Sequence, residues 1–340
     1  MKQQDHFKQA NIYTALEEND SYASKSMVHN KALVKIHGGI GDALMSLPVI
    51  KKLSEQYTVD VILRDPKKSP IGEWVEDIIQ NNPFINEIIP WHKMMSDLKS
   101  MRRYKKVVIL AAHNYDQEIY YRDPMPRIEF MGSLAGVTDC RASDIDLFLH
   151  KDEIAWANNT LEDIKNPVII QPTVLRDPWP NNQGKQIPVD IYPKLFEDFP
   201  DLTFIGLGTM VLTADGRIDY GDMATLDNAP NYISMANKTN IRQAVALLKQ
   251  SVTHILPDSF LNHASGGLNK KGIVIFGNTS PQVYGYKNNY NLWYAPPCSP
   301  CRLQDPMDAA VQEDCCIKDG IPVEYDNLKR NFKKLLTEVL

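Results

Sequence analysis

A mainly apolar run that ends in a glycine cluster and an acid constrains this chain more than any other stretch. Residues 33–36 lead into Gly38, Gly39 and Gly41, and Asp42 is followed by apolar residues at helical spacing. This order predicts a strand, a tight turn and a helix start, where α/β proteins present backbone amides to a ligand. The glycines let a ligand approach the main chain closely. Because a carboxylate adds nothing to a phosphate-only loop, we expect Asp42 to handle a proton or a hydroxyl.

Two familiar glycine-loop motifs do not fit this chain. The G-x-x-x-x-G-K-[ST] loop of nucleoside triphosphatases is absent, since Lys185 is followed by Gln186. The dinucleotide fingerprint G-x-G-x-x-G starts at Gly39 and Gly41, but its third glycine position holds Leu44. A glycine turn that only joins a strand to a helix is the plain alternative.

The composition is that of a globular protein without a strong charge. The chain has 340 residues, of which 43% are hydrophobic and 23% charged, with a net charge of −5. This length predicts two α/β domains of about 150 residues each. The charge gives no overall signal for nucleic acid or an anionic membrane. The polar N-terminus has no signal core, and no stretch reaches the roughly 20 apolar residues of a transmembrane segment, so we expect a cytoplasmic protein.

Strand-like and helix-like segments alternate in two consecutive series. In the first series the pattern predicts strands at 33–37, 59–63, 87–90 and 107–111, and helices at about 42–56, 71–81 and 124–135. In the second it predicts strands at 168–171, 202–206, 254–256 and 273–276, and helices at 189–198, 240–250 and 259–268. Such alternation favours parallel sheets with helices on both faces.

The expected fold class is α/β, with two tandem Rossmann-like doubly wound domains that face each other across a cleft. Ligands of such domains bind outside the carboxyl ends of the strands. The predicted parts are an N-terminal extension at 1–30, a first domain at 31–155, a second domain at 166–322 and an amphipathic terminal helix at 323–340.

Three strand ends of the second domain carry small polar groups and a cation. Asp258 and Ser259 follow one strand at helix-cap positions, and His263 can share a helix face with Ser259. A helix start of this kind suits a diphosphate, and a lysine is a point charge for one. The other strand ends supply Thr173, Lys185 and Thr279. A capped helix with a buried histidine and a solvated loop lysine are the plain alternatives.

Four of the five cysteines lie between residues 298 and 316. They form a C-x-x-C pair and an adjacent pair, Cys298, Cys301, Cys315 and Cys316. Four thiolates hold structural zinc in many proteins, and tetrahedral sulfur also suits iron. Adjacent cysteines rarely bind one ion together, so free thiols and a disulfide stay open as alternatives. We do not expect these thiols to act in redox catalysis.

Taken together, the motifs resemble the heptosyltransferase-like glycosyltransferases of family nine. The segments that carry the resemblance are 34–48, 237–242, 258–263 and 276–281, which have the order and approximate spacing of that family. The resemblance runs from about residue 31 to 320 and implies a GT-B fold. It also implies an acceptor in the first domain, a nucleotide sugar in the second, inversion at the anomeric carbon and no cofactor for catalysis.

The resemblance implies a role for each motif residue. Asp42 would be the general base that deprotonates the acceptor hydroxyl, beside a glycine loop that lets sugar or phosphate approach. Asp258 would orient its helix start or bind a sugar hydroxyl. The residues that would hold the donor are Thr173, Lys185, Ser259, His263 and Thr279. Two departures from the family are Ser259-Phe260 in place of Thr-Gly and the long loop between Thr173 and Lys185.

The predicted function is therefore an inverting glycosyltransferase with an ADP- or UDP-linked sugar donor. Its acceptor would be a lipopolysaccharide-core-type saccharide, a protein or a hydroxymethylated DNA base. A first-domain patch that would meet acceptor phosphates, or simply be solvated, consists of Lys99, Arg102, Arg103, Lys105 and Lys106 around Tyr104. Cysteine-rich tails, one of them an iron-binding finger, also occur in similar enzymes. The alternatives are an NAD-binding oxidoreductase or epimerase and a non-catalytic nucleotide-sugar binder.

Overall fold

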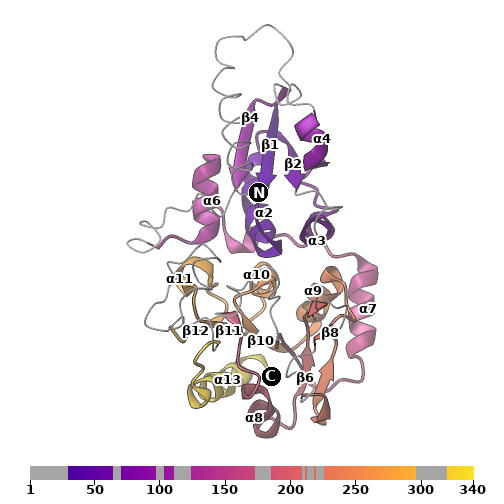
Figure 1. The fold of residues 1–340 in the computed structure, drawn as a ribbon, viewed down its shortest axis with the longest axis vertical. Helices are drawn as coiled ribbons and strands as arrows, with labels where there is room; N and C mark the ends of the chain where they lie inside the picture. Colours follow the sequence, from indigo (N-terminus) through magenta and orange to yellow (C-terminus); the bar gives the residue numbers. More distant parts are fainter. Residues whose placement is uncertain are drawn as a thin grey trace.

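The chain forms two α/β halves stacked end to end, with α10 directly below α2 (Figure 1). The computed structural model describes residues 30–63, 70–96, 103–110, 124–172, 185–208, 211–212, 218–219, 226–295 and 320–340. The predicted domain limits stay a prediction. Within these residues the strands form two larger parallel sheets and one short antiparallel pair, which consists of β7 (Val211–Leu212) and β8 (Ile218–Asp219).

The first sheet has the strand order β3-β2-β1-β4 and is parallel throughout. Its strands are β1 (Lys31–Ile36), β2 (Thr58–Leu63), β3 (Glu87–Pro90) and β4 (Lys106–Leu110). The helices around it are α2 (Ile40–Ser54), α3 (Pro70–Ile79), α4 (Trp91–Ser96) and α6 (Arg127–Ala135). The predicted helix at 124–135 starts three residues later than expected, because a residue before proline is driven away from the α region and Pro126 precedes the helix.

The second sheet has the strand order β12-β11-β10-β5-β6-β9 and is also parallel. Its strands are β5 (Pro167–Ile170), β6 (Thr203–Gly206), β9 (Tyr232–Ser234), β10 (Thr253–Pro257), β11 (Ile273–Phe276) and β12 (Tyr290–Trp293). Its helices are α8 (Ile191–Asp198), α9 (Ile241–Gln250), α10 (Phe260–Gly267), α11 (Pro281–Tyr284) and the terminal α13 (Tyr325–Val339). The sequence predicted the four inner strands but missed the two edge strands, β9 and β12.

A single apolar core joins the two halves. It contains Val34 and Leu47 of the first half together with Ile169, Leu256 and Leu261 of the second. The opposite face of the second sheet has its own core, beneath α8 and α13. Neighbouring residues of β5 belong to different cores, as the alternation of side chains along a strand requires.

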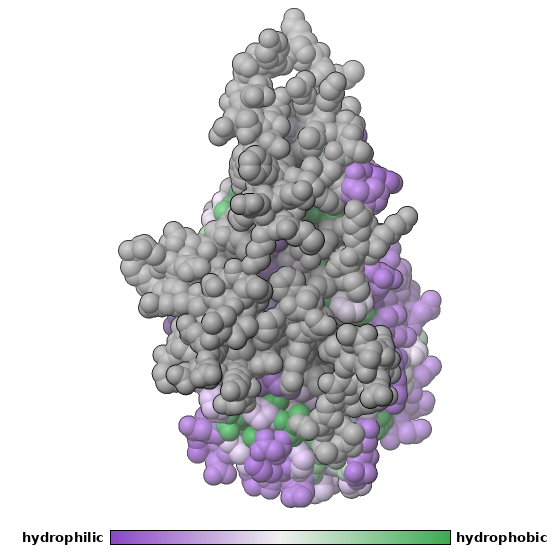
Figure 2. Space-filling view, in the orientation of Figure 1, coloured by the Kyte–Doolittle hydropathy of each residue, from purple (hydrophilic) through white to green (hydrophobic). Residues whose placement is uncertain are grey.

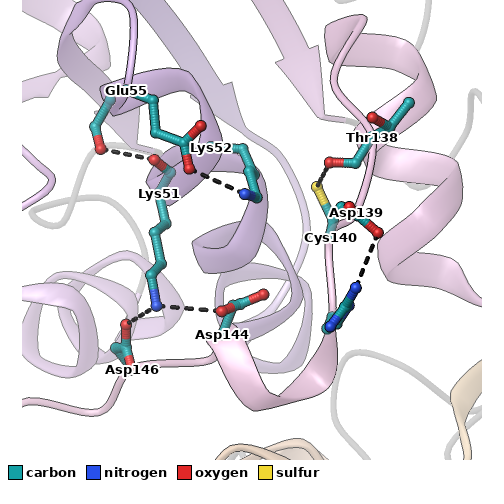
Figure 3. A network of polar contacts seen from close by, with 10 residues as sticks. Lys51, Lys52, Glu55, Thr138, Asp139, Cys140, Asp144 and Asp146 are labelled. Atoms are coloured by element: carbon teal, nitrogen blue, oxygen red, sulfur yellow. Dashed lines mark hydrogen bonds and ion pairs between the residues drawn. The ribbon is translucent and has the colours of Figure 1, made fainter.

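The segment between the two sheets is attached to both halves. It includes the 3₁₀ helix η5 (Ala142–Asp144) and α7 (Lys151–Leu161). Figure 3 shows Lys51, near the end of α2, bound to Asp144 at 3.2 Å and to Asp146 at 2.9 Å. Farther along, the segment meets the second half through Arg242 of α9.

Arg242 of α9 joins the second half to the connecting segment and to α3 of the first half. Its Nε and Nη2 donate to the two carboxylate oxygens of Glu153 at 2.5 and 2.9 Å. Its remaining bonds go to backbone carbonyls, at 2.7 Å on Phe148 and 3.2 Å on Asp77 of α3. Burial alone would raise the pKa of Glu153, but the bonds from Arg242 and the His150 amide lower it below its usual value. The ion pair therefore holds α9 against α7, and the bond to the Asp77 carbonyl joins α9 to α3.

The described surface carries several large exposed apolar side chains. At the lower end of the view in Figure 2 the described residues are mainly hydrophilic, with small hydrophobic areas between them. The large exposed apolar side chains are scattered over different elements, at Met125, Leu134, Ile233, Trp293 and Leu340. No helix in the described part of the chain has the length and apolar character needed to span a bilayer.

Candidate active site

The glycine loop between β1 and α2 holds the carboxylate of Asp42 in place. Oδ2 of Asp42 accepts a hydrogen bond from the backbone N–H of Gly39 at 3.0 Å. Gly38 has a φ of +125°, and a Cβ there would stand 2.2 Å from the same oxygen. Only glycine therefore fits at position 38. Among the described residues nothing bonds to Oδ1 of Asp42, so this half-buried carboxylate keeps one oxygen available.

The same loop touches the second half of the chain through His263 of α10. A Cβ on Gly41 would stand 2.7 Å from Cδ2 and 3.0 Å from Nε2 of His263. Real Cβ atoms do not approach that closely, so this contact depends on the missing side chain of Gly41. It brings the start of α2 and the first turn of α10 together, which the sequence alone could not show.

Asp258 is the centre of a buried cluster at the carboxyl end of β10. Its Oδ2 is paired with Nζ of Lys185 at 2.9 Å and accepts from the hydroxyl of Thr279 at 2.8 Å. Its Oδ1 is buried without a partner in the described part of the chain. Burial alone would raise the pKa of Asp258, but the charge of Lys185 and the hydrogen bonds from Lys185 and Thr279 hold the pKa below its usual value. The group is thus a carboxylate.

Ser259 is already bonded to a neighbouring strand end. Its hydroxyl donates to Oε1 of Gln171 at 2.6 Å and does not cap α10. The first backbone N–H groups of α10 therefore have no side-chain cap from Ser259, and such groups are a common binding site for anions. Gln171 was not among the predicted site residues, although its position directly after β5 placed it at a strand end.

His263 is a neutral ring within this cluster. It is 4% exposed, and its Nδ1 lies 2.7 Å from the hydroxyl of Tyr286. Burial lowers the pKa of His263 to about 4, although the nearby charges of Asp258 and Asp42 act in the opposite direction. The sequence analysis also missed Tyr286. Its position shortly after the 276–281 motif was the only feature that pointed to it.

The structure thus brings most of the predicted site residues to the α2–α10 junction and leaves others aside. Those that lie there are Gly38, Gly39, Gly41, Asp42, Lys185, Asp258, Ser259, His263 and Thr279. Thr173 lies outside the described residues, as do Lys99, Arg102 and the cysteines Cys298, Cys301, Cys315 and Cys316. In the part of the chain that the structure describes, no group of three or more His, Cys, Asp or Glu residues is arranged for a metal.

The described part of the basic patch does not face this site. Tyr104 is buried, and its hydroxyl donates to Asp60 of β2 at 2.8 Å. Its side chain therefore packs within the first sheet and is not exposed to a ligand. Lys106 pairs in register with Ala32 at the start of β1, whereas the glycine loop follows the end of that strand. The described part of the patch, residues 103–106, is therefore at the opposite end of the first sheet from Asp42.

Comparisons with known proteins find a family match that includes α10 and solved structures with a similar fold. The model of glycosyltransferase family 9 (heptosyltransferase) matches residues 222–310. A structure of E. coli ADP-heptose LPS heptosyltransferase II has a TM-score of 0.59 and 16% identity, over 91% of this chain and 99% of that one. A family 9 glycosyl transferase from Veillonella parvula has a TM-score of 0.62 and 13% identity, over 91% and 97%.

A third similar structure is the dodecameric iron-containing heptosyltransferase TibC in complex with ADP-D-beta-D-heptose. It has a TM-score of 0.59 and 10% identity, over 92% of this chain and 78% of that one. No curated protein sequence matches the chain significantly. The family match and the shared fold confirm the predicted resemblance and the GT-B architecture. They support a nucleotide-sugar glycosyltransferase and do not favour an NAD-binding oxidoreductase or epimerase.

Proposed function

We propose that the α2–α10 junction transfers a sugar from a nucleoside-diphosphate donor to an acceptor hydroxyl, with inversion at the anomeric carbon. The contact between His263 and Gly41 carries this proposal, because it unites a carboxylate from one half with a cation and a helix start from the other. Asp42 lies one residue beyond Gly41, and Lys185 is tied to Asp258 just before α10. Base and leaving-group partners are then on opposite sides of one site.

The second half would hold the donor. Lys185 uses one of its three N–H groups on Asp258, so the others can reach a diphosphate. The first amides of α10 would bind the same anion. Together they would stabilise the negative charge that develops on the leaving group. ADP-heptose in the names of two similar structures supports an ADP-linked donor, with a UDP-linked donor as the next choice.

The first half would bind the acceptor and take its proton. The acceptor hydroxyl gives its proton to Oδ1 of Asp42 while its oxygen attacks the anomeric carbon. The bond from that carbon to the diphosphate oxygen breaks, and its electron pair leaves with the nucleoside diphosphate. No metal enters these steps as we propose them. Because Lys106 lies at the opposite end of the first sheet from Asp42, a saccharide or protein acceptor is favoured over a hydroxymethylated DNA base.

Replacing Asp42 by asparagine tests this assignment, because the amide oxygen can still accept from Gly39. We expect Asp42→Asn to lower nucleoside diphosphate release from ADP-heptose or a UDP-hexose by about 10²- to 10⁴-fold, with acceptors or water present. Donor affinity by calorimetry should stay near that of the wild type. Asp139→Asn, at an exposed residue, is the control. Unchanged turnover in Asp42→Asn would mean that Asp42 is not the base, whereas a wild type that binds the donor without turnover would be a nucleotide-sugar binder.

The cysteine cluster at 298–316 remains a proposed structural site for zinc or iron. Of these two metals, iron is supported by the name of TibC, which is called iron-containing. Elemental analysis of the purified chain should find about one metal ion per four thiolates. Serine at Cys298 and Cys301 should abolish it. A metal-free wild-type protein with free thiols would contradict this proposal.

A further inference from the structure

We infer that Tyr286 is a positioning residue that fixes the ring tautomer of His263, with the proton on Nε2 beside Gly41. The effect of this tautomer on the reaction rests on the proposed function, whereas the hydrogen bond itself does not. The Tyr286 hydroxyl lies 2.7 Å from Nδ1 of His263, and the two rings are almost perpendicular, at 87°. The other ring nitrogen, Nε2, is the one that faces the glycine loop.

The direction of this hydrogen bond follows from the burial of the phenol. Tyr286 is 7% exposed, and burial raises its pKa well above the usual value, so the hydroxyl keeps its proton. Among the described residues Nδ1 of His263 is its only hydrogen-bond partner. If Nδ1 carried a proton, the phenol would have to accept that bond and its own hydrogen would be left unpaired at considerable cost. The hydroxyl therefore donates to Nδ1, and the neutral ring carries its proton on Nε2.

The surroundings of Tyr286 hold it in this position. A Cβ on Gly266 would stand 2.7 Å from Cγ of Tyr286, so the phenol ring lies directly on α10 one turn beyond His263. The backbone carbonyl of Tyr286 accepts from the amide N–H of Asn289 at 3.1 Å and from Nδ2 of Asn291 at 2.9 Å. The loop after α11 thus holds the Tyr286 hydroxyl beside His263 and restricts its movement.

The fixed tautomer gives the site a neutral hydrogen-bond donor. Nε2–H of His263 lies beside Gly41, within the junction where the donor and acceptor would meet. There it can donate to an oxygen of the leaving diphosphate without adding a charge. The opposite tautomer would present a lone pair to the same oxygen and repel it. Tyr286 would therefore act on the reaction through His263 and not by contact with the substrate.

The tautomer can be measured without substrate by long-range ¹H–¹⁵N NMR of the histidine-labelled full chain. His263→Gln identifies the His263 signals. We expect Nε2 of wild-type His263 to be protonated and Nδ1 not, and Tyr286→Phe to give a mixture of tautomers. A proton on Nδ1 in the wild type would overturn the inference, as would an unchanged tautomer in Tyr286→Phe. Tyr294→Phe removes another buried phenol, which bonds to the Glu324 carbonyl, and should change nothing.

Measurements of turnover show whether Tyr286 acts through His263 or only contributes to packing. We expect Tyr286→Phe to lower turnover by about three- to tenfold, the effect of one hydrogen bond, and to have no further effect in the His263→Gln background. An equal loss in both backgrounds would mean that Tyr286 acts structurally and would overturn the inference. Absence of turnover in the wild type with every donor would count against the proposed function, whereas the wild-type NMR result would still decide the tautomer.

Discussion

Two of the contacts that hold the halves of this chain together have opposite character. At Arg242 the contact is a buried ion pair with two further bonds to backbone carbonyls. At Gly41 it is the close approach of a histidine ring to a glycine, and no hydrogen bond joins the two residues. The first contact resists separation, whereas the second can part without breaking a polar bond.

Removing the arginine should have the largest effect on stability. Its side chain is 6% exposed and that of Glu153 19%, so Arg242→Met leaves a largely buried carboxylate unpaired. We expect a loss of about 3 kcal/mol in the free energy of unfolding, measured by urea denaturation. Arg141→Met, at a pair with exposed fractions of 69% and 71%, is the matched control and should change stability little. Equal effects of the two variants would mean that the Arg242 pair holds the protein no better than an exposed ion pair.

A methyl group at the glycine contact should affect turnover more than stability. In Gly41→Ala the new Cβ meets the His263 ring at 2.7 Å and must displace it. We expect turnover to fall by about 10- to 100-fold, because small misplacements are costly in catalysis. Gly39→Ala makes the same change in the same loop where a Cβ meets nothing within 4 Å, so its loss of turnover should be clearly smaller. Equal turnover in both variants would show that the contact does not matter to the reaction.

The pH dependence of stability should report on the histidine contact. The pKa of His263 is about 4 in the folded protein, below its ordinary value of 6.5. Between these values the unfolded chain binds the proton more readily, so stability present above pH 6.5 is lost as the pH falls toward 4. The slope of the unfolding free energy against pH gives the number of protons taken up on unfolding. This number should be smaller in His263→Gln by up to about one. An unchanged slope would mean that His263 is not buried as a neutral ring.

The smallest effect is expected at Lys51, where α2 meets the segment that leads to α7. The exposed fractions are 31% for Lys51, 22% for Asp144 and 33% for Asp146, so water screens both pairs. Lys51→Met should cost about 0.5 kcal/mol in the free energy of unfolding, and less in high salt. A loss as large as that of Arg242→Met would place the main attachment of the halves here instead.

The sequence predicted the parts of this fold that a local pattern specifies. The inner strands β10 and β11 are short apolar runs, and α10 begins after a polar pair, so their positions followed from composition and capping residues. The edge strands β9 and β12 were missed, because strands of three and four residues with mixed polarity have no clear period. Element boundaries moved by up to three residues, as at Pro126.

The candidate site was predictable as a set of residues but not as an arrangement. Asp42 and His263 each stand in a motif, yet their apposition depends on how the halves pack. Hydrogen bonds such as Ser259 to Gln171 and Tyr286 to His263 join residues 88 and 23 positions apart. No local spacing encodes them, since they exist only when β5, α10 and the loop after α11 are in place.

The central claim is that the α2–α10 junction binds a nucleoside-diphosphate sugar, and ligand-dependent thermal stability tests it most directly. The panel consists of ADP, UDP, GDP, CMP, their sugar conjugates and NAD, with wild-type protein and Lys185→Met. We predict that one nucleoside diphosphate and its sugar raise the melting temperature of the wild type, and that Lys185→Met removes most of this shift. A shift with NAD alone, or an identical nucleotide shift in Lys185→Met, would contradict the account.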